Sequence, residues 1–189
     1  PLEHAIVAMR PVTPTQPFDI PNSTRLLDPT MPENAELAPP PGGFMDPAGN
    51  PVNGVLNLNV NFGWEYVWHC HILSHEEMDM MHNLTMAVAP TAPTNFTLLR
   101  QGSGNTQRVL LNWVDTSHNE TGFSIQRSIT PVDGPWLTVA VAPPAAGRGS
   151  ALSFTDTTVA RRTTYYYRIT ADNLVGDTQT WAAPAIGFP

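Results

Sequence analysis

One short segment, residues 64–81, holds the side chains best suited to chemistry. It contains the single cysteine, Cys70, followed by His75 and then by Met80 in a Cys-x4-His-x4-Met spacing. A thiolate and imidazoles with a weak axial methionine form the ligand set of blue-copper electron-transfer sites. Zinc is the main competitor for Cys and His clusters, but its structural sites usually show paired cysteines or histidines. The methionine spacing favours copper.

Two further histidines, His69 and His71, flank Cys70 directly. The aromatic and β-branched run at 64–71 predicts a strand, on which successive side chains point to opposite faces. Cys70 should therefore face one way, and both flanking histidines the other. An electron on a metal held by Cys70 could pass through the cysteine backbone to either histidine. We therefore expect a second metal centre behind the strand.

The run HCHILSHEEMDMM resembles the C-terminal copper motif of multicopper oxidases, the family that includes laccases. The resemblance implies that Cys70 and His75 bind a type 1 copper, with Met80 as its axial ligand. It also implies that His69 and His71 each bind one type 3 copper of a trinuclear cluster that reduces oxygen.

The similarity extends over residues 1–88 and implies the activity of a laccase-like oxidoreductase. A small reducing substrate would give up electrons singly at the type 1 copper, and dioxygen would be reduced to water. The family is secreted or periplasmic, so the resemblance implies that location for this chain as well.

The family's upstream His-Pro-x-His-x-His segment, which supplies the remaining type 1, 2 and 3 ligands, has no counterpart here. Outside the motif the histidines are His4, His82 and His118, each isolated in the sequence. We therefore expect this chain to be the C-terminal portion of a longer oxidase, inactive by itself because the type 2 ligands are missing.

Three other functions fit parts of the pattern. A copper nitrite reductase shares the three-ligand core, but its family has no histidine immediately after the cysteine, so His71 argues against it. A simple blue-copper carrier would need neither His69 nor His71. A non-catalytic binding protein with a vestigial copper segment would not be expected to retain all five ligands.

Composition excludes several classes of partner. The formal net charge is −7, with nine scattered arginines and no lysine, so the chain has no basic footprint for nucleic acid. No apolar run approaches the ~18 residues that indicate a membrane helix. The single cysteine leaves none for disulfides.

The chain divides into four stretches, all predicted to be β-structured or extended. Residues 1–51 are proline-rich and should drape over a surface. Residues 52–88 offer strands at 55–60, 64–71 and 84–88, too few for a closed cupredoxin sandwich. This partial cupredoxin-like (plastocyanin-like) portion should therefore expose an apolar face. Residues 89–94, APTAPT, form a hinge-like linker.

Residues 95–189 predict an immunoglobulin-like sandwich of seven short strands, at 95–99, 108–113, 122–127, 136–141, 152–156, 164–171 and 178–183. The runs VLLNWVD, NETGFSIQRS and TYYYRITADNLVG resemble a fibronectin type III domain. That resemblance makes Trp113 the core tryptophan and Tyr165 the corner tyrosine. Such modules act as spacers or bind proteins or carbohydrates, so we expect a partner of one of those kinds.

Overall fold

The computed structural model describes residues 8–37, 43–45, 48–132 and 134–176, and this part of the chain is almost entirely β. These described residues form twelve strands and two short helical turns, α1 (Leu73–Glu76) and the 3₁₀ turn η1 (Gly104–Thr106). The prediction of an all-β protein is confirmed. Within the same residues, neither helical turn has the length or apolar character needed to cross a membrane.

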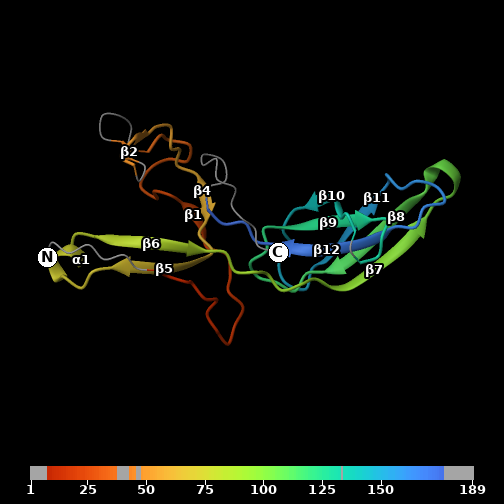
Figure 1. Cartoon of the computed structure of the whole chain (residues 1–189), viewed down its shortest axis with the longest axis horizontal. Coiled ribbons are helices and arrows are strands. Elements are labelled where there is room, and N and C mark those ends of the chain that lie inside the picture. Colours follow the sequence, from red (N-terminus) through yellow and green to blue (C-terminus); the bar gives the residue numbers. More distant parts are fainter. Residues whose placement is uncertain (1–7, 38–42, 46–47, 133, 177–189) are drawn as a thin grey trace.

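The C-terminal half is a sandwich of two three-stranded sheets (Figure 1). One sheet has the order β11–β8–β7 and the other β10–β9–β12, all neighbours antiparallel. The strands are β7 (Thr94–Gln101), β8 (Arg108–Val114), β9 (Gly122–Ser128), β10 (Leu137–Ala142), β11 (Ala151–Asp156) and β12 (Tyr166–Asp172). Six of the seven predicted strands are found within two residues of their expected ends, and 178–183 lies outside the described residues.

Alternation along β8 and β9 builds the core of this sandwich. Leu111 and Trp113 lie two apart on β8, and Phe123 and Ile125 lie two apart on β9, so each pair faces inward. All four side chains are buried and contact one another. The Trp113 and Phe123 rings lie 5.8 Å apart between centroids. Trp113 is therefore the buried core tryptophan on the second strand of the sandwich, as predicted.

The N-terminal half is built from three separate two-stranded sheets. β1 (Thr24–Leu26) pairs with β4 (Asn59–Asn61), β2 (Phe44–Met45) with β3 (Pro51–Val52), and β5 (Trp64–His69) with β6 (Met81–Met86). Figure 1 shows the β5–β6 hairpin extending away from the sandwich, with α1 at its far end.

The predicted strand at 55–60 is largely absent, and the fully buried side chain of Asn57 explains why. Its amide donates to the carbonyl oxygens of Asp28, Met31 and Pro32 at 2.8–3.0 Å, and its oxygen accepts from the Asp28 amide. The segment therefore holds a turn in place instead of joining a long ladder. Only its end belongs to a strand, β4.

The other two predicted strands shift at their ends. The strand expected at 64–71 stops at His69, and the one expected at 84–88 runs from Met81 to Met86. The proline-rich stretch contains no helix among its described residues. Apolar residues of a stretch that drapes over a surface should be covered: Ile20 is buried there, whereas Phe18 and Phe44 remain exposed.

The expected apolar exposure of the N-terminal half is present. On β5, the Val67 and Trp68 side chains are 56% and 51% exposed, and Met45 is 72% exposed. Val67 and Trp68 follow one another and so point to opposite faces of β5, which means that each face carries an exposed apolar side chain near the end of the strand.

Asparagine side chains join the two halves. The Val88 carbonyl accepts from Asn119 at 2.8 Å and from Asn173 at 3.0 Å, and both asparagines are buried. The Asn61 amide donates to the Asn173 side chain and to the Leu174 carbonyl, each at 3.0 Å. The chain is thus held to the sandwich immediately before the 89–94 stretch.

Candidate metal centre

The candidate metal centre lies at the tip of the β5–β6 hairpin. The last ladder pair joins His69 to Met81, so Cys70 and Met80 are the first residues beyond the ladder on either side. Between them the chain makes the single turn α1, in which the amides of His75 and Glu76 both donate to the Ile72 carbonyl. The loop is short and tied at both ends, which favours one fixed arrangement of its donors.

The first pair of predicted ligands meets on this loop. The Cys70 Sγ atom lies 3.3 Å from His75 Nδ1. The cysteine is free and exposed, and the histidine is half-buried. A thiol and an imidazole at this separation present a soft and a borderline donor to the same space, a combination that suits copper or zinc.

Met80 is tied to the same residue through its backbone. The Met80 amide donates to the His75 carbonyl at 3.0 Å, and the Asp79 amide donates to the Glu76 carbonyl at 3.1 Å. Asp79 has a φ of 54°, in the left-handed region, so these bonds form a Schellman-type ending of α1. The motif turns the chain back toward His75. The Met80 side chain itself is 54% exposed.

The two flanking histidines form a second group. The rings of His69 and His71 lie 4.9 Å apart between centroids and are tilted by 53°. The Glu76 carboxylate is 3.5 Å from His69 Nδ1. Donor atoms of these three residues all lie within 4.8 Å of one another, a spacing that could hold a metal ion.

Glu76 was not predicted as a ligand from the sequence. Beside His75 in the sequence, it looked like one of several solvated loop acids. A prediction of the helical turn α1 would have identified Glu76 as a possible ligand, because a helical turn directs the neighbouring side chains of residues 75 and 76 to different sides.

The donor set is partial on the Cys70 side. Among the described residues, the only group of three or more His, Cys, Asp or Glu donors is the one at His69, His71 and Glu76. No second imidazole therefore accompanies Cys70 and His75 in that part of the chain. The residues present fit a copper ion in their chemistry, and they leave part of its coordination to other ligands.

A short stretch of this chain matches a known protein. A laccase of Bacillus subtilis (strain 168) is 44% identical over 50 residues, which are 24% of this chain and 10% of the laccase. The match indicates a laccase-like relationship over that short stretch. No family model matches the chain. No solved structure matches it either.

Proposed function

We propose that residues 1–88 carry part of the copper-binding machinery of a laccase-like multicopper oxidase. The observation that carries this proposal is the 3.3 Å approach of Cys70 Sγ to His75 Nδ1, with His69 and His71 paired separately on the same loop. The short laccase match supports the same class of protein.

In this proposal each donor has one role. Cys70 and His75 hold a type 1 copper with Met80 as its axial ligand, while His69 and His71 each hold a type 3 copper. Bound copper would supply the one-electron chemistry by which a small reducing substrate is oxidised and dioxygen is reduced to water.

The chain's own contribution is connection and orientation. Peptide bonds join Cys70 directly to His69 and to His71, so the two groups of donors are linked by the shortest covalent path available. The Glu76 carboxylate lies 3.5 Å from His69 Nδ1 and can orient that ring. The exposed apolar side chains of β5 would be covered by the rest of a cupredoxin domain in a complete oxidase.

We further propose that residues 95–189 form a fibronectin type III module that acts as a spacer or binds a partner. The strand order supports this, as does the Tyr165 hydroxyl, which accepts a hydrogen bond from the Ala160 amide at 3.1 Å. A corner tyrosine in immunoglobulin-like sandwiches bonds to the backbone a few residues upstream in this way.

Copper(I) affinity tests the metal-binding role. Soft thiolate and thioether donors select copper(I), so a competition titration against a copper(I) chelator should show one site in the full chain. Cys70→Ser should weaken that affinity more than about tenfold, which is about 1.4 kcal/mol. His82→Ala, which removes a histidine outside both donor groups, is the matched control. Equal affinity in all three proteins would overturn the proposed site.

A further inference from the structure

A second candidate site lies in the sandwich, far along the sequence from the copper motif. A cavity of about 730 Å³ opens between one edge of β7 and β8 and the segment 159–165. Its volume falls in the range of ordinary small-molecule pockets, roughly 300–1,000 Å³. Four arginines line it, Arg100, Arg108, Arg161 and Arg162.

The charge of this pocket is opposite to that of the whole chain. The protein has a net charge of −7 and only nine cationic side chains, all arginine, so four of nine converge here. No acidic residue belongs to the lining. None of the ion pairs found among the described residues involves any of these four arginines, so none of the four is paired with a carboxylate there.

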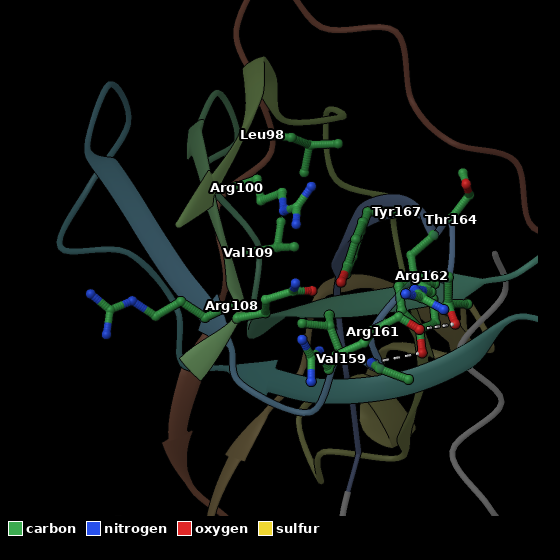
Figure 2. A pocket seen from close by; sticks show the side chains of 13 residues that line it. Leu98, Arg100, Arg108, Val109, Val159, Arg161, Arg162, Thr164 and Tyr167 are labelled. Carbon is green, nitrogen blue, oxygen red and sulfur yellow. Dashed lines mark hydrogen bonds between the residues drawn. The ribbon is translucent and has the colours of Figure 1, made fainter. Parts of the chain in front are cut away.

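The geometry separates these arginines into two kinds. Figure 2 shows Arg100 from β7 and Arg161 from the facing segment directed into the same space, with Tyr167 beside them. Arg108 extends away from that space, and its Nε donates to Gln101 at 2.9 Å. Arg161 also donates to Asn105, but that bond is long at 3.5 Å, so Arg100 and Arg161 are the pair placed to meet one ligand from two sides.

The wall that carries Arg161 is fixed by its neighbours. The Tyr165 hydroxyl accepts from the Ala160 amide at 3.1 Å, and the Arg127 guanidinium stacks 4.5 Å from the Tyr165 ring centroid. Arg127 is itself held by Asp156 at 2.7 Å. A segment braced in this way presents its charges in a defined place, which lowers the entropic cost of binding.

We propose that this pocket binds the oxyanion group of a small organic ligand, a carboxylate or a sulfate ester. Planar guanidinium groups pair with both groups through two parallel hydrogen bonds. Leu98, Val109 and Val159 line the same cavity and offer an apolar surface to the body of the ligand. A small acid that is part polar and part apolar, such as an acidic sugar, matches this lining.

Calorimetric titration of the full chain with glucuronate, glucose 6-sulfate and glucose tests the proposal. At least one of the two anions should bind saturably, and neutral glucose should not. The stronger anion identifies whether the oxyanion is a carboxylate or a sulfate. Binding of neither anion, or binding of glucose with equal affinity, would overturn the proposal.

Variants that each remove one positive charge locate the binding. Arg100→Gln and Arg161→Gln should each weaken the anion at least about tenfold, because a charge-assisted hydrogen bond is lost. Arg108→Gln should have a smaller effect, and Arg10→Gln, in the other half of the chain, should have none. Equal weakening by all four variants would show attraction by overall charge alone and reject the pocket. Binding of a sulfated polysaccharide with no binding of either small anion would also reject it.

Discussion

Single side chains decide the chemistry of the hairpin tip. Three methionines there, Met78, Met80 and Met81, are candidates for the axial ligand. The Schellman-type bond from the Met80 amide to the His75 carbonyl turns residue 80 back toward the Cys70–His75 pair. Met81 pairs with His69 in the β5–β6 ladder, so it lies in the strand and outside the loop that carries Cys70 and His75. This local backbone argument, which is independent of family spacing, supports our proposal of Met80 as the axial ligand.

Met80→Leu should weaken copper(I) binding by about tenfold, because a thioether donor is lost while the side chain keeps its size. Met81→Leu removes a thioether from the neighbouring residue and should leave the affinity unchanged. Chelator competition measures both variants under the same conditions. A larger effect of the Met81 substitution would show that the axial assignment is wrong.

Asp156 is a single buried residue on which the stability of the sandwich depends. Burial raises the pKa of its carboxyl, but hydrogen bonds from Thr158 and Tyr167 and the charge of Arg127 outweigh burial and lower the pKa below its usual value. A lowered folded-state pKa gives stability that is fully present above the unfolded pKa of about 4 and is lost as pH falls through the folded pKa.

Asp156→Asn should lower the free energy of unfolding at neutral pH by about 3 kcal/mol, because it leaves Arg127 half-buried without its counter-charge. Denaturant unfolding at a series of pH values is the measurement. The difference between variant and parent should shrink as the pH falls below about 4. A difference that stays constant down to low pH would mean that the carboxylate charge is not the cause.

Among the elements, the sandwich strands were the most predictable from sequence. Their inward residues alternate strictly, as Leu111 and Trp113 do on β8, and a period of two identifies a half-buried strand directly. The segment around Asn57 shows the opposite case. Its alternation looks like a strand, but the buried amide bonds to a turn more than twenty residues away, which no local pattern encodes.

The candidate site was predictable in its residue types but only partly in its grouping. Strand alternation predicted that Cys70 faces away from His69 and His71. β5 ends at His69, so Cys70 and His71 lie beyond the ladder where alternation does not apply, and the Cys70–His75 pair and the His69–His71–Glu76 group are arranged by the loop instead. Glu76 joined the histidine group through the helical turn α1, which was not predicted. The arginine pocket could not be predicted, because its members come from β7, β8 and a distant loop and meet only after folding.

Trp113→Ala tests the core that β8 and β9 build together. The side chain is almost fully buried, so its removal should cost about 3–5 kcal/mol of unfolding free energy. Trp68→Ala removes the same side chain from an exposed position on β5 and should change stability by about 0.5 kcal/mol or less. Denaturant unfolding of the full chain compares them. Similar losses in the two variants would contradict the assignment of the core.

For the whole molecule, the asparagine contacts at residue 88 are one part of the seam between the halves, which also includes the Asn22 bond to the Glu120 carbonyl and the pairing of Asp19 with Arg148. Asn173→Ala removes one of two donors to the Val88 carbonyl and also one of the three acceptors of the Asn61 amide. Loss of such buried bonds costs about 1–3 kcal/mol, so amide hydrogen exchange across residues 59–88 should speed up about tenfold.

Exchange across β8 and β9 should stay unchanged in the same variant, because Asn173 is not part of the core cluster that these strands build. Asn112→Ala, on β8, is the matched control and should not affect residues 59–88. Unchanged exchange in residues 59–88 after the Asn173 substitution would show that the halves fluctuate independently.

The same asparagine seam has a consequence for protein engineering. A module joined only by a flexible tether can be cut out and grafted onto another enzyme as a cassette. Here the sandwich supplies Asn119 and Asn173 to a carbonyl of its neighbour, and it receives Asn61 in return. A graft that ends at the 89–94 stretch would leave these asparagines facing an unrelated surface. A transferable unit must therefore carry β4 and Val88 with the sandwich, and because Asp19 and Asn22 also bond to the sandwich, the boundary of a chimera belongs upstream of residue 19.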